Sequence, residues 1–219
     1  MLKEKRNAKV YILYILLFFL AWTLETFLVS GRLEAAFSTS VSGLSQDGIC
    51  KTLIWAVPAL LLIRRYNDRL FVQKELFVPR HGWPLFLAIF LVFTVYLLII
   101  KYRQSGKIAL AEDFSPLLIL VYLFVGFNEE IVFRGWLLNA VYREDKMWQC
   151  FLVNSLLFLA IHFPSWIQHG SFAGNILSGG FMSIVLLSFV FSFSFVKSRN
   201  IVVPALLHFW WDLLIVCLK

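Results

Sequence analysis

Long apolar runs separated by short polar stretches form the pattern of this chain. Most of these runs approach or exceed the roughly 20 residues that an α-helix needs to cross a bilayer. Helices are the expected structure, because an open sheet would leave backbone N–H and C=O groups unsatisfied in lipid. Pro58 interrupts the second run. The runs are Val10–Ser30, Leu44–Ile63, Trp83–Ile100, Phe114–Tyr142, Trp148–Phe163, Leu177–Val196 and Ile201–Leu218.

Composition supports a membrane protein. The chain is 60% hydrophobic and only 15% charged, whereas soluble domains carry about 45–50% apolar and about 25% charged residues. The pattern therefore predicts an all-α, polytopic transmembrane helix bundle of about 7–8 helices. The eighth is a re-entrant or interfacial piece around Trp166 to Asn175. We expect one membrane-embedded domain that spans residues 1–219, because no linker divides the chain.

The distribution of basic residues predicts the orientation. The N-terminal segment and the loops on its side carry roughly twice as many Lys and Arg residues as the opposite loops, which places the N-terminus in the cytoplasm. This count treats Lys51 as a residue of the first loop. Lys3, Lys5, Arg6 and Lys9 precede the first apolar run, which is long enough to be an uncleaved span rather than a signal peptide.

The net charge of +7 fits the same interpretation, because short basic clusters beside apolar runs are typical of contacts with anionic lipid headgroups. Membrane lipid is thus an expected partner and nucleic acid is not. Cys50, Cys150 and Cys217 are too widely spaced for a metal-binding pair and odd in number. We expect them to be ordinary small apolar residues.

Ionisable residues within the fourth run are the strongest functional signal. Glu129, Glu130 and Arg134 lie inside Phe114–Tyr142, and charges at bilayer depth are costly unless they are paired or face a wet cavity. Glu130 and Arg134 are four residues apart on a predicted helix, so an ion pair is expected. Glu129 is rotated by about 100° from Glu130, and its partner must come from elsewhere: another helix, a metal ion or water.

His162 is the partner that the sequence predicts for Glu129. A turn near Glu144 and Asp145 separates the fourth and fifth runs. At 1.5 Å per residue, Glu129 lies about 22 Å and His162 about 27 Å from that turn, so the two reach comparable depth. Phe158 precedes His162 by one helical turn and shares its face. Pro164 is expected to end this helix just beyond the histidine.

His208 and Asp212 form a third polar cluster, again four residues apart, within the last run. Two chemical routes stay open for the three clusters together. Glu129, His162 and His208 can hold a zinc ion whose bound water is acidified. Without metal, a desolvated Glu129 can act as a general base on water, and His208 or Asp212 can orient a ligand or stabilise an oxyanion. Both routes end in hydrolysis of an amide bond.

These residues resemble a known family. The order E-E-x-x-x-R, F-x-x-x-H and H-x-x-x-N/D, with each motif on its own helix, is similar to that of the CPBP intramembrane proteases, which include CAAX proteases and bacteriocin-processing Abi-type proteins. Gly135, after the arginine, also looks like the family. The resemblance covers residues 114–219 as the catalytic core, while residues 1–113 match only as membrane helices. It implies an active site inside an intramembrane polar cavity.

The resemblance also implies roles for individual residues. Glu129 and His162 would activate the attacking water, His208 and Asp212 would stabilise the oxyanion or bind metal, and Glu130 with Arg134 would form a supporting ion pair. Family members have been described as glutamate-dependent and as metal-dependent, so zinc stays open as a cofactor. Asp212 stands where eukaryotic members typically have Asn, and an anion there favours a cation or a protonated His208.

The expected activity is therefore an intramembrane endopeptidase that acts on a hydrophobic peptide or a membrane-anchored protein. The small size and the abundance of Phe, Ile, Leu and Lys resemble bacterial members, which implies the bacterial cytoplasmic membrane. The alternative is a non-catalytic immunity or regulatory protein that binds a peptide or a sensor kinase. A proton-coupled transporter is a third interpretation, against which stands the lack of an internal repeat.

Overall fold

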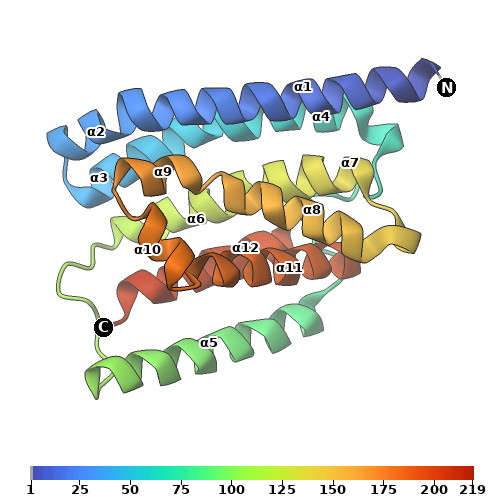
Figure 1. The fold of residues 1–219 in the computed structure, drawn as a ribbon. Coiled ribbons are helices and arrows are strands. Elements are labelled where there is room, and N and C mark those ends of the chain that lie inside the picture. Colours follow the sequence, from blue (N-terminus) through green and yellow to red (C-terminus); the bar gives the residue numbers. More distant parts are fainter. Residues whose placement is uncertain (1) are drawn as a thin grey trace.

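The computed structural model describes residues 2–219, with side chains described from residue 8 onward. The described chain is predominantly helical, and its long helices lie side by side in a bundle (Figure 1). This confirms the all-α membrane bundle that the apolar pattern predicts. Lys3, Lys5 and Arg6, which the orientation prediction counts, lie outside the part of the chain whose side chains are described.

The helical elements follow one another through the whole chain, and η denotes a π-helical or 3₁₀ segment. The first half contains α1 (Leu2–Glu25), η1 (Thr26–Ser30), α2 (Gly31–Ala36), α3 (Thr39–Gly43), η2 (Leu44–Cys50), η3 (Thr52–Ala56), α4 (Val57–Tyr66), η4 (Asn67–Arg69) and α5 (Trp83–Ser105). The second half contains α6 (Leu117–Glu130), η5 (Ile131–Leu138), α7 (Asn139–Val141), η6 (Glu144–Lys146), α8 (Met147–Ala160), α9 (Phe163–Gln168), α10 (Phe172–Leu177), α11 (Gly180–Ser198) and α12 (Val202–Cys217).

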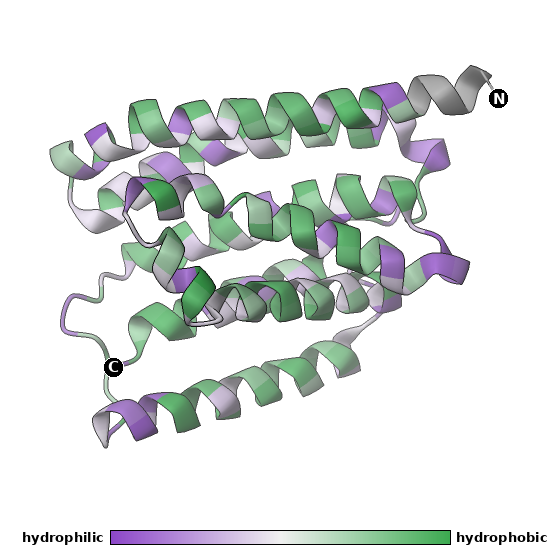
Figure 2. Ribbon diagram, viewed as in Figure 1, coloured by the Kyte–Doolittle hydropathy of each residue, from purple (hydrophilic) through white to green (hydrophobic). Residues whose placement is uncertain are grey.

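Five helices in the described chain are long and apolar enough to cross a membrane, by length and composition. The helix α6–η5–α7 is not among them, since it carries three ionisable side chains in its middle, and α12 is a shorter apolar helix. Hydrophobic residues cover the helix bodies, whereas hydrophilic ones gather at several helix ends and connections (Figure 2). The five candidate spans are Ala8–Ala36, Thr39–Arg69, Trp83–Ser105, Glu144–Gln168 and Gly180–Ser198.

The second span differs from its prediction at both ends. It runs for 31 residues, Thr39–Arg69, instead of starting at Leu44. Pro58 does not interrupt it, because this residue lies in the first turn of α4 directly after a π-helical stretch, where its missing N–H is tolerated. Lys51, predicted to lie in the first loop, is therefore inside a continuous helical run and is buried.

The fifth run also ends differently. Helix α8 stops at Ala160, before His162, and Pro164 lies in the first turn of the next short helix, α9. The piece predicted around Trp166 to Asn175 consists of the two short helices α9 and α10. His162 consequently occupies a turn between two helices and not the interior of one.

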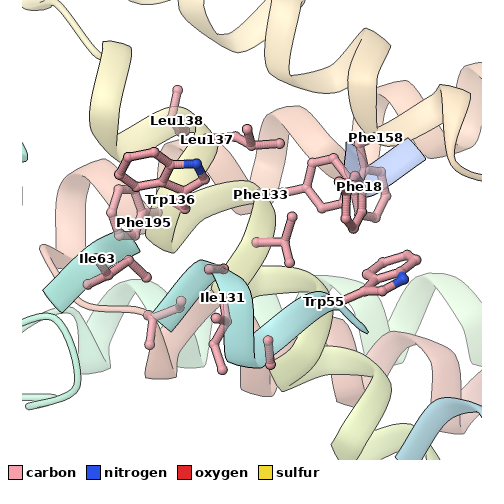
Figure 3. Close-up of a cluster of buried hydrophobic side chains, with 14 of the residues drawn as sticks. Phe18, Trp55, Ile63, Ile131, Phe133, Trp136, Leu137, Leu138, Phe158 and Phe195 are labelled. Atoms are coloured by element: carbon pink, nitrogen blue, oxygen red, sulfur yellow. The ribbon is translucent and has the colours of Figure 1, made fainter. Parts of the chain in front are cut away.

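A cluster of aromatic side chains holds the first helices against the second half of the bundle. Phe18 from α1 packs edge-on against Trp55 of η3, with ring centroids 4.9 Å apart (Figure 3). Phe133 of η5 contacts Phe158 of α8 in the same geometry at 5.0 Å. All four side chains are almost completely buried. Two of them, Trp55 and Phe158, also border the polar groups described below.

Helices α6 and α12 approach each other unusually closely at Gly126. A Cβ atom built on this glycine would lie 2.6 Å from the carbonyl oxygen of Ala205 and 3.0 Å from the amide nitrogen of Phe209. Both are backbone atoms, so a side chain here could be accommodated only by moving the helices apart. Gly126 thus permits the contact between the two helices that carry most of the candidate site.

Candidate active site

Glu130 and Arg134 form the ion pair that their spacing predicts. Nη1 of Arg134 donates to Oε1 of Glu130 at 2.8 Å, and both side chains are fully buried. Nη2 of Arg134 donates to both the carbonyl and the hydroxyl oxygen of Ser188, at 2.9 and 2.7 Å. The guanidinium also lies over the ring of Phe158, 4.8 Å from its centroid. Arg134 therefore joins the site helix to α8 and α11.

His208 connects the two acidic motifs. Its Nδ1 lies 3.0 Å from Oε1 of Glu130, and its Nε2 lies 3.3 Å from Oδ2 of Asp212. Ionised carboxylates only accept hydrogen bonds, so this arrangement favours an imidazolium with a proton on each nitrogen. The ring stacks on Phe191, with centroids 4.8 Å apart and planes inclined by 19°. The structure thus brings the first and third motifs together.

Glu129 has a partner that the sequence analysis missed. Nζ of Lys51 donates to its Oε1 at 2.8 Å, and the other oxygen, Oε2, lies 3.9 Å from Nε2 of His208. The prediction that places Lys51 in a loop is wrong, since this side chain points into the bundle. One signal in the sequence could have found it: Asp47 precedes Lys51 by four residues, the spacing of a helical ion pair. That pair is present at 2.7 Å.

His162 lies near Glu129 without being its first partner. Electrostatic interactions connect His162 to Glu129, to Lys51 and to Asp212. Its Nδ1 lies 2.9 Å from the carbonyl oxygen of Phe158. A carbonyl oxygen can only accept, so Nδ1 carries a hydrogen and Nε2 of the neutral ring is left as an acceptor. The ring of Phe158 lies near both imidazoles, with its centroid 5.4 Å from that of His162 and 5.8 Å from that of His208.

The expected zinc ligands are not arranged around a metal position. In the part of the chain that the structure describes, no three His, Cys, Asp or Glu side chains could hold a metal ion together. Both nitrogens of His208 face carboxylates, and an ammonium group contacts Glu129. The arrangement of these donor groups therefore does not fit a zinc ion bound by Glu129, His162 and His208.

Buried carboxylates, imidazoles and basic groups inside a helical membrane bundle define an integral membrane protein with an internal polar site. A family model described as type II CAAX prenyl endopeptidase Rce1-like matches residues 111–214. This part of the chain is similar to that family, which confirms the resemblance to the CAAX proteases and supports an intramembrane protease in general. All three motifs lie within the matched residues. Comparison with curated proteins and with solved structures found no match.

Proposed function

We propose that this protein is an intramembrane endopeptidase that hydrolyses a peptide bond in a hydrophobic or membrane-anchored substrate, with Glu129 as the general base. One observation carries the proposal: Glu129 is buried, is 5% exposed, and lies beside an imidazole that two further carboxylates contact. The family match over residues 111–214 supports the same reaction class.

The reaction requires one proton transfer to Glu129 and one away from it. Oε2 of Glu129 accepts a proton from water while the water oxygen attacks the carbonyl carbon of the substrate. The tetrahedral intermediate collapses, the C–N bond breaks, and the proton passes from Glu129 to the leaving amine. The products are a new carboxyl terminus and a new amino terminus.

The two histidines have different roles in this proposal. Nε2 of His208 lies 3.9 Å from Oε2 of Glu129. Its N–H is therefore placed to stabilise the negative oxygen of an intermediate that forms beside Glu129. Glu130 and Asp212 hold the His208 ring in place and favour its charged form. His162, with Nε2 free to accept a proton, assists Glu129 in withdrawing the proton from water.

A polar cavity lies near the site. Its volume is about 410 Å³, and it is bordered by Asp47, which binds Lys51, and by Tyr122 of α6. Tyr122 interacts electrostatically with Asp212, Asp47 and Lys51. The cavity is therefore bordered by two residues that interact with Lys51 and, through Tyr122, with Asp212.

A reconstitution experiment tests the proposal. Purified protein in liposomes is supplied with a quenched fluorescent CAAX peptide carrying a farnesylated cysteine, and in parallel with membrane proteins of the source cell, whose new termini are mapped by mass spectrometry. We expect hydrolysis at defined bonds, and we expect it to persist with a metal chelator because the ligand groups are already paired. No new terminus from either substrate would reject the protease and leave the non-catalytic immunity or regulatory protein.

A further inference from the structure

Lys51 contacts the candidate base and lies outside the family match. It is 7% exposed and is separated from Glu129 by 78 residues of sequence. The matched region, residues 111–214, contains all the motif residues but not this lysine. The first half of the chain therefore contributes a charged group to the site as well as membrane helices.

Three separate contacts fix the ammonium group of Lys51. Asp47 binds it at 2.7 Å from within the same helical run. The ring centroids of Trp55 and Trp22 lie 4.9 and 5.3 Å from Nζ, at distances typical of cation–π contacts. With Asp47 on one side and two indole rings beside it, the ammonium is presented to Oε1 of Glu129.

The backbone around Lys51 is also tied to the helix that bears Glu129. The side-chain amide of Asn128 donates to the carbonyl oxygen of Asp47 at 2.9 Å and to the hydroxyl of Thr52 at 3.0 Å. Asn128 directly precedes Glu129, and Thr52 directly follows Lys51. The two charged residues are thus held in register by neighbours that are themselves hydrogen-bonded to each other.

We infer that Lys51 is a positioning residue of the active site: its ammonium holds Oε1 of Glu129, keeps that carboxylate ionised, and directs Oε2 toward His208 and the reacting water. The inference rests on the proposed function of Glu129. Burial favours the uncharged form of a carboxylate, and a neighbouring positive charge opposes that tendency. A carboxylate must be ionised before it can accept a proton, so the lysine determines whether the base is available.

Several other charged groups surround Glu129 and must be considered with Lys51. The remaining positive neighbours are Arg134 on the same helix and, when protonated, the two histidines. Arg134 is already bound to Glu130, and His208 lies between Glu130 and Asp212. Lys51 is therefore the cation whose hydrogen bond Glu129 itself accepts. The charged groups that interact with the carboxylate are Lys51, His162, His208 and Arg134. The other carboxylates nearby contact these cations: Asp47 contacts Lys51, Glu130 contacts Arg134 and His208, and Asp212 contacts His208.

The first experiment measures the charge of Glu129 by infrared spectroscopy on the full-length protein in liposomes. We compare the wild type with Lys51→Met, Lys51→Arg and the double variant Lys51→Met/Glu129→Gln. At neutral pH we expect a protonated-carboxyl band in Lys51→Met that is absent from the wild type and from Lys51→Arg. The band should disappear in the double variant, which assigns it to Glu129. This measurement needs no substrate.

The second experiment measures hydrolysis of the farnesylated reporter peptide as a function of pH. Lys51→Met should lower kcat by about tenfold or more with little change in KM, and should move the acid limb of the rate profile to higher pH. Lys51→Arg, which keeps the charge, should restore much of the rate. Lys146→Met removes an exposed lysine of the turn η6, away from the site, and it should leave both quantities unchanged.

The two experiments distinguish a failure of the proposed protease function from a failure of the role inferred for Lys51. Failure of the wild type to cleave any substrate would remove the proposed function, while the infrared comparison would still show whether Lys51 sets the charge of Glu129. A Lys51→Met variant without the carboxyl band, or with the wild-type rate and pH profile, would reject the inference. Lys51 would then have only a structural role, as one partner of an ion pair. If Lys51→Met does not fold, an arginine variant that folds but lacks activity and carries the band would equally reject the inference.

Discussion

Replacement of Glu129 by Gln is expected to abolish peptide hydrolysis, with a fall in kcat of about 10²–10⁴-fold, the range attributed to a positioned general base. Glutamine keeps the size of the side chain and can still accept a hydrogen bond from Lys51, but it cannot take a proton from water. The variant should therefore accumulate in the membrane like the wild type. The measurement is the initial rate of reporter cleavage at equal protein content.

Glu144→Gln is the matched control, because Glu144 lies in the exposed turn η6 away from the site. It makes the same chemical change, and its rate should equal that of the wild type. Full activity of Glu129→Gln would contradict the proposed base and, with it, the mechanism in which Glu129 and His208 act together.

Replacement of Arg134 by Met is expected to give the largest loss of stability. Removing one partner of a buried ion pair costs about 3–5 kcal/mol, because the other charge is left uncompensated. The lower end of this range is expected here, since His208 still contacts Glu130. Ser188 would also lose both of its hydrogen bonds from the guanidinium. Unfolding in mixed detergent micelles measures the change.

Arg143→Met provides the control for this substitution. Arg143 pairs with Asp145 at 2.7 Å on the surface, where both side chains are 60% exposed, and exposed pairs contribute little to stability. No measurable change is expected. The double variant Arg134→Met/Glu130→Gln should recover part of the lost stability, because it removes the stranded charge. Equal stability of Arg134→Met and the wild type would contradict the structural role of the pair.

Local spacing explains how much of the site could be predicted. Residues four positions apart on a helix share a face, and this rule alone identified the contacts of Glu130 with Arg134 and of His208 with Asp212. The same apolar pattern that revealed the helices made these charges conspicuous. The helical class and these two contacts therefore followed from information contained within single runs.

Contacts between runs that lie far apart in the sequence are harder to predict. The number of residues between each side chain and the turn predicts that His162 lies near Glu129. The two do interact electrostatically, but Lys51 binds the carboxylate directly. Lys51 was missed because a lysine near a polar stretch, Ser45 to Lys51, resembles the end of a membrane segment. The π-helical geometry of η2 and η3 depends on packing and has no simple sequence signal. It determines which face of this run carries the lysine.

The close approach at Gly126 has a consequence for variation in this chain. This glycine lies one helical turn before Glu130, and opposite it on α12 the backbone leads within one turn to His208. The distance between α6 and α12 beside the candidate site therefore depends on the lack of a side chain at Gly126. A variant with alanine here would retain every motif residue, but the helices that carry Glu129 and His208 would have to move apart. The presence of the motif residues alone would not reveal this change in their spacing.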